Sequence, residues 1–239
     1  MKNFKKQKLF GLFALTTLLT ACDYNDNDGV NTVIDSEEDN IEVVTSSIYE
    51  VTLSNITQGQ IFSPPALTTH QAGMKLWQAG ETASIALETL AESGDSSQLI
   101  TLTGIESSQV SPSAVMPGDA YNWTLELAQD ASKSISVATM LINTNDGFTG
   151  ITDMDLSSLA LGDSYQKMLM VYDAGTEEND EIAIPGSGGE AFNASRSGDV
   201  DRVYAHAGVL TEHELSGSLL SAEHKFDNPA GKLIIKRVQ

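Results

Sequence analysis

Seven short, strand-like runs separated by loops rich in Gly, Ser and Asp place the strongest limit on the fold of this chain. Polar and apolar residues alternate within the runs, as expected for strands that bury one face. The first run, Ile48 to Thr57, adds the β-branched residues that strands favour. The other runs cover residues 98–103, 121–128, 134–142, 165–172, 200–207 and 231–238. The pattern predicts an all-β fold, an antiparallel two-sheet β-sandwich, rather than a doubly wound parallel sheet.

Two segments depart from this pattern. Residues 81–91 have the composition of a short helix, and the connection over residues 59–80 is too long to be a plain turn. We see no internal repeat and no sign of a second folded domain. We therefore expect one sandwich domain over residues 48–239.

The N-terminus has the pattern of an export signal. Several lysines precede an apolar stretch from Leu9 to Leu19, which is too short to span a membrane comfortably. The stretch ends in Leu19-Thr20-Ala21-Cys22, and Cys22 is the only cysteine in the chain. This ending resembles the lipobox of bacterial lipoproteins, in which the signal is cut before a cysteine that carries the lipid. Residues 1–21 are then a lipoprotein signal peptide.

Lipidation of Cys22 implies a membrane anchor, because two or three acyl chains on one residue hold a protein stably at a bilayer. The alternative is an ordinary secretory signal with an incidental cysteine. Asp23 resembles the inner-membrane retention signal of enteric bacteria, but that rule varies between lineages, so the inner and the outer membrane both stay open. The expected location is the bacterial cell envelope, on its periplasmic or surface face.

Acidic residues dominate the charge of the chain. The sequence has 33 Asp and Glu against 13 Lys and Arg, a net charge of −20. Such a charge repels phosphate backbones, so we expect no nucleic-acid partner. Residues 22–47 are rich in acids and poor in bulky apolar side chains, and we interpret them as an extended acidic tether. With no cysteine left for a disulfide, a hydrophobic core and a metal ion are the candidates for holding the fold.

Two acidic loops that follow strand-like runs carry the candidate metal ligands. Asp173 and Glu177 stand four residues apart around Gly175, which can adopt positive φ and turn the chain back. The other loop, residues 143–150, supplies Asp146 as a third carboxylate. Ca²⁺ takes six to eight oxygen ligands, so these three with carbonyls and water form a plausible shell. The alternative is that they are solvated acids in an acidic chain.

The order of several short motifs resembles the spondin N-terminal domain, a family of extracellular matrix and bacterial exported proteins. The motifs are Tyr49 to Thr57, Phe62-Ser63-Pro64-Pro65, Leu90 to Asp95, Ala138-Thr139-Met140-Leu141, Asp146 with Gly150, and Tyr172 to Glu177. The resemblance implies a calcium-binding β-sandwich, similar to the calcium-dependent lipid-binding sandwiches. It also implies extracellular contacts rather than catalysis.

The resemblance assigns calcium ligation to Asp146, Asp173 and Glu177. The chain departs from the family at Glu177, where aspartate is usual. It departs again after Asp146, where the family has an aromatic residue and this chain has Gly147 before Phe148. These departures bear on calcium affinity.

The sequence thus predicts a lipid-anchored, calcium-binding adhesion module whose partner is an unknown protein or polysaccharide. One alternative is a structural envelope lipoprotein without metal. A second is a hydrolase that uses Glu92 and Asp95 as an acidic dyad. The sequence favours structural roles for His70, Trp77 and Trp123, and the histidines lack the short paired spacings of zinc sites. The remaining acids near the loops are interpreted as solvated: Asp153, Asp155, Glu178, Asp180 and Glu181.

Overall fold

The computed structural model describes residues 46–188, 192–198 and 200–239. The signal peptide expected at residues 1–21, the lipidation site Cys22 and the tether up to residue 45 lie outside the described residues. Ser46 and Ser47, assigned above to the tether, belong to the first strand. Among the described residues, no helix is long and apolar enough to cross a membrane.

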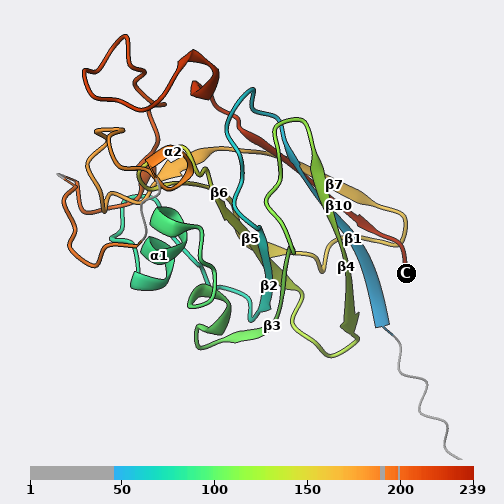
Figure 1. Cartoon of the computed structure of the whole chain (residues 1–239). Coiled ribbons are helices and arrows are strands. Elements are labelled where there is room, and N and C mark those ends of the chain that lie inside the picture. Colours follow the sequence, from blue (N-terminus) through green and yellow to red (C-terminus); the bar gives the residue numbers. More distant parts are fainter. Residues whose placement is uncertain (1–45, 189–191, 199) are drawn as a thin grey trace, which may run out of the picture. The chain divides into compact units, whose positions relative to one another are not determined.

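Two antiparallel sheets form the domain, which confirms the predicted sandwich (Figure 1). The four-stranded sheet has the order β4 (Ala120–Ala128), β1 (Ser46–Asn55), β10 (Gly231–Arg237) and β7 (Ser164–Leu169). The six-stranded sheet has the order β3 (Ile105–Val110), β2 (Ala66–His70), β5 (Ser134–Met140), β6 (Gly147–Asp155), β8 (Val171–Asp173) and β9 (Tyr204–Ala205). Neighbouring strands pair antiparallel throughout.

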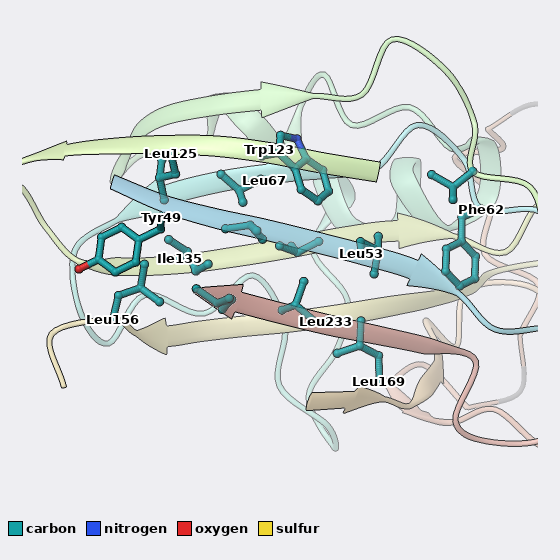
Figure 2. Packing of buried hydrophobic residues seen from close by; sticks show 14 of the residues in the cluster. Tyr49, Leu53, Phe62, Leu67, Trp123, Leu125, Ile135, Leu156, Leu169 and Leu233 are labelled. Atoms are coloured by element: carbon teal, nitrogen blue, oxygen red, sulfur yellow. The ribbon is translucent and has the colours of Figure 1, made fainter. Parts of the chain in front are cut away.

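The main core fills the space between the sheets. In β1, Tyr49, Val51 and Leu53 are fully buried because alternate side chains of a strand point to one face. Figure 2 shows Tyr49 and Leu53 in one layer with Leu233 of the same sheet and Ile135 of the other. Each fully buried side chain of this size contributes about 1.5–3 kcal/mol. This layer, rather than a disulfide, holds the two sheets together.

A helix covers the outer face of the six-stranded sheet. Helix α1 (Ile85–Ser93) lies against this sheet (Figure 1), and its Leu87 and Leu90 belong to one buried cluster with Ala138 of β5 and Phe148 of β6. The helix begins where the hydroxyl of Ser84 accepts a hydrogen bond from the Leu87 N–H at 3.2 Å. It ends at Gly94, whose φ of 73° suits a glycine. Three shorter helices complete the fold: α2 (Pro185–Gly188) and the 3₁₀ turns Leu99–Thr101 and Ala222–His224.

The expected strand over residues 98–103 is wrong. The chain there forms the 3₁₀ turn Leu99–Thr101, because Leu99 packs into the apolar cluster under α1. The strand comes later, as β3, whose largely exposed residues show no alternation. Strand β2 lies inside the long connection and was not predicted. All five of its residues are buried, so its sequence does not alternate between polar and apolar residues. The polar side chains of β2 form hydrogen bonds with the neighbouring strands. For example, Ser136 Oγ of β5 lies 2.8 Å from His70 Nε2.

Three further boundaries differ from expectation. The run over residues 165–172 is two strands, because β7 pairs in one sheet and β8 in the other, with Met170 between them. The run over residues 200–207 contributes only Tyr204–Ala205. The expected loop over residues 143–150 already contains the start of β6. The first residue of β6 is important because it places Asp146 directly before an interior strand, next to the end of β8.

Candidate functional site

The pairing of β6 with β8 brings the two aspartates of the acidic loops together. Gly147, the first residue of β6, lies opposite Asp173, the last residue of β8. Asp146 precedes Gly147, so both aspartates sit at the same end of adjacent antiparallel strands. The Ala174 N–H donates to the backbone carbonyl of Asp146 at 3.1 Å and continues the pairing into the loop.

The carboxylate of Asp146 holds the loop that follows Asp173. Its Oδ2 accepts hydrogen bonds from the Thr176 N–H at 2.7 Å, the Thr176 hydroxyl at 3.1 Å and the Glu177 N–H at 3.1 Å. Its Oδ1 is buried and has no hydrogen-bond partner among the described residues. A buried carboxylate oxygen without a partner is costly. One oxygen of Asp146 is therefore structural, and the other lies buried in a carboxylate that interacts closely with Asp173.

Asp173 is held on both of its oxygens. Oδ1 accepts from the Gly175 N–H at 2.8 Å, and Oδ2 accepts from the Asn179 side chain at 2.7 Å. Gly175 has a φ of 74°, and a Cβ there would lie 2.4 Å from the carbonyl oxygen of Arg202. A side chain at this position would displace the neighbouring segment, so the loop requires glycine for both reasons.

Glu177 joins the site through its backbone. Its N–H donates to Asp146, and its side chain is 7% exposed. Within the described part of the chain, no three His, Cys, Asp or Glu side chains come together as a ready metal-binding group. The structure thus brings Asp146 and Asp173 side by side and attaches Glu177 to them by its main chain. A cation here would need carbonyl, amide or water oxygens as well, as calcium sites commonly do.

Burial and the nearby charge of Asp173 make the carboxyl group of Asp146 costly to ionise. Burial, reinforced by the charge of Asp173, raises the pKa of Asp146 to about 7, although the N–H groups of Thr176 and Glu177 oppose this. Burial also raises the pKa of Tyr204, whose phenol lies against Asp173. A cation beside Asp146 would lower the cost of ionising its carboxyl group.

His206 follows β9 and lies against the same pair of strands. Its Nδ1 accepts from the Gly208 N–H at 3.0 Å, so the neutral ring carries its proton on Nε2. That nitrogen is buried and has no hydrogen-bond partner among the described residues. Burial lowers the pKa of His206, and the charge of Asp173 opposes this shift. The histidine therefore supplies little positive charge to the aspartates.

Buried acids outnumber nearby bases around this end of the sandwich. Among the residues that the structure describes, six acids are at most 7% exposed: Glu88, Glu92, Asp146, Asp173, Glu177 and Glu181. Glu88 is paired with Arg196 at 2.6 Å. In the described part of the chain, no Lys or Arg forms a salt bridge with Asp146, Asp173 or Glu181. This imbalance favours a bound cation.

Most of the surrounding residues were missed or misread from the sequence. Glu181 was interpreted as solvated, but it is 1% exposed because residues 208–220 fold over it. Thr176 and Asn179 lie within the acidic loop, but their contacts with the aspartates depend on the strand pairing. No sequence pattern near the acidic loops points to Tyr204 and His206. They lie in and directly after β9, about 30 residues further along the chain, and reach the site only through the fold.

The other candidate residues have structural surroundings. Glu92 Oε2 accepts from the Asn193 N–H at 3.1 Å, whereas Asp95 accepts from the N–H and hydroxyl of Ser97 on the surface. The two acids therefore do not form a dyad around a common site. His70, Trp77 and Trp123 are buried, in accord with the structural roles expected for them.

Comparison with known protein families gives a match. The profile of a family described as Spondin_N matches residues 56–190, more than half of the chain. Asp146, Asp173 and Glu177 all lie within the matched segment. No curated protein matches the chain.

Proposed function

The chain belongs to the spondin N-terminal domain family, and on that premise we propose that it is an exported adhesion module whose loop site binds one calcium ion. Domains of this family are extracellular in type and non-catalytic. The membership therefore directs the search for function to binding.

The unpartnered Oδ1 of Asp146 carries the calcium proposal. It is buried beside Asp173, while the other oxygen of the same carboxylate is fully used by the loop. A divalent cation would supply both a partner for this oxygen and the charge that relieves repulsion between the aspartates.

Asp146, Asp173 and Glu177 are the side chains that we assign to the ion. The oxygen-rich surroundings, with Thr176 and Asn179 at hand, suit calcium. Zinc prefers nitrogen and sulfur ligands, which this end of the domain offers only through His206. The bound ion would supply electrostatic cross-linking of the loops, and this would stiffen one end of the sandwich.

Differential scanning calorimetry tests this proposal. At about 100 times its dissociation constant, calcium adds about 2.7 kcal/mol to the free energy of unfolding. For a domain of this size we expect the melting temperature to rise by about 5–10 °C. Asp173→Asn removes the response, whereas Glu178→Gln, which alters an exposed acid in the same loop, retains it. An unchanged melting curve with calcium and with chelator would refute the metal site.

We further propose that Cys22 carries a lipid and that residues 22–47 tether the domain to a membrane of the bacterial cell envelope. The short apolar stretch ending in Leu19-Thr20-Ala21-Cys22 supports this. Tethering would present the domain to a protein or polysaccharide partner. Retention of the purified protein on immobilised matrix polysaccharides, with and without calcium, tests the adhesive role.

A structural envelope protein without metal is the second candidate. One observation favours it: the described residues contain no preformed group of three metal-ligating side chains. The two candidates differ in the calorimetric experiment, because only the calcium-binding module gains stability from the ion.

A further inference from the structure

A cavity of about 730 Å³ lies beside the loop site, outside the set of residues assigned to calcium. Its walls come from the segment after β1, from residues 179–181 and from the C-terminal segment between residues 207 and 229. Most of this lining follows residue 190, where the family match ends. Its volume falls within the range of small-molecule sites, which is roughly 300–1,000 Å³.

One part of the wall is apolar and open to solvent. Ile56 is 44% exposed and Leu210 is 45% exposed, and both line the cavity with the half-buried Phe226. Large aliphatic side chains exposed together around a concavity provide a surface that an aliphatic ligand would cover.

The polar part of the wall contains a buried carboxylate. Glu181 is 1% exposed, and its Oε1 accepts from the Leu210 N–H at 3.0 Å. Its Oε2 is buried and has no hydrogen-bond partner among the described residues. Burial raises the pKa of Glu181 to about 7, with smaller contributions from the charges of Asp180 and Asp173. A hydrogen-bond donor or a positively charged group would supply the interaction that Oε2 of Glu181 lacks.

The charges around the cavity select the sign of the ligand. Lys225 lines the wall, but its ammonium is engaged by Glu214 at 2.5 Å. Asp227 adds a second acid to the lining. With the ammonium of Lys225 paired to Glu214, the other ionisable residues of the lining, Glu181 and Asp227, are both acidic, in a chain of net charge −20. An anion would be repelled, and a cation attracted.

We propose that this cavity binds a small organic cation, a primary ammonium on a short aliphatic chain. The ammonium donates to Oε2 of Glu181, and the chain covers Ile56 and Leu210. The site adjoins the calcium loop through Asn179, which lines the cavity and donates to Asp173. Glu181 is not among the proposed calcium ligands, so the two sites can be tested separately.

The test is a titration of the ¹⁵N-labelled protein, followed by NMR in chelator at neutral pH. Three probes share one carbon chain: n-butylammonium, n-butanol and n-butyrate. We expect butylammonium to shift the Leu210 amide and to bind at least about tenfold more tightly than butanol, as a charge-assisted hydrogen bond provides. Butyrate should bind least. Equal binding of all three probes, or no shift at Leu210, would overturn the proposal without any variant.

Variants test whether Glu181 causes the preference for butylammonium over butanol. Glu181→Gln should reduce the preference for butylammonium over butanol by about tenfold or more. Glu212→Gln, the same change at an exposed acid outside the cavity, should leave it unaltered. Asp173→Asn should abolish calcium binding and retain butylammonium binding, which keeps the failure of either proposal distinct. Displacement of butylammonium by calcium in Asp173→Asn would make the cavity a metal site and contradict the inference.

Discussion

At the scale of single residues, Asp146 combines two roles in one carboxylate. Oδ2 organises the loop through three accepted hydrogen bonds, and Oδ1 is left buried without a partner. The neighbouring Asp173 is satisfied by its own loop. Loop architecture and the proposed ion affinity can therefore be separated by substitutions at Asp146.

Asp146→Asn should preserve the loop and remove the ion site. The amide oxygen can accept from Thr176 and Glu177, and loss of the charge relieves repulsion with Asp173. Asp146→Ala removes the acceptor as well and should cost about 3 kcal/mol, at about 1 kcal/mol for each of three hydrogen bonds. Chemical denaturation in chelator measures both. If Asn is as damaging as Ala, the charge itself is required for the loop.

The stability of the ion-free protein should fall as pH rises from about 4 to about 8. The pKa values of Asp146 and Glu181 are raised to about 7 in the folded state, from ordinary values of 3.8 and 4.5. The folded state then binds more protons than the unfolded state in this range, so rising pH favours unfolding. Melting temperatures in chelator test this, and Asp146→Asn should show a shallower decline. A flat profile for the unaltered protein would contradict the assigned pKa values.

At the scale of elements, α1 is connected to the loop region by a buried ion pair. Arg196 donates from Nε and from a terminal nitrogen to Glu88 Oε2, and also to the carbonyl of Ala83. Glu88 is fully buried, whereas the side chain of Arg196 is 23% exposed. The pair holds the segment around Arg196 on the N-terminal turns of the helix.

Arg196→Gln should destabilise the domain by about 3 kcal/mol, because it leaves the carboxylate of Glu88 buried without its partner. The double variant Glu88→Gln/Arg196→Gln should recover part of this loss, since no charge is then left unpaired. Urea denaturation compares them, with Lys75→Gln, at an exposed position, as the control. A double variant as unstable as the single one would show that the pair stabilises by packing instead.

The elements also show where sequence reasoning succeeds. Strands with one solvated face, such as β1, β4 and β10, carry the alternation that predicts them. Strand β2 is covered on both faces and loses that signal. The pair Asp146 and Asp173 was predictable from acids placed after strand-like runs. Glu181, Tyr204 and His206 were not, because their burial comes from contacts with distant segments.

At the scale of the whole molecule, the N-terminal anchor is the feature that would distinguish a tethered adhesion module from a free one. The mature protein should begin at Cys22, and mass spectrometry should find acyl chains on that residue. Cys22→Ser should release the protein from the membrane fraction while leaving the domain folded, since the sandwich contains no cysteine. An unmodified N-terminus at any other residue would contradict the anchor.

The calcium site is the central claim for the molecule, and a crystal structure grown with calcium tests it most directly. We expect a single ion within about 2.3–2.6 Å of Asp146 Oδ1 and of carboxylate oxygens of Asp173 and Glu177, with carbonyl or water oxygens completing the shell. A map that shows no ion between these aspartates at millimolar calcium, with Asp146 Oδ1 bonded to water alone, would contradict it.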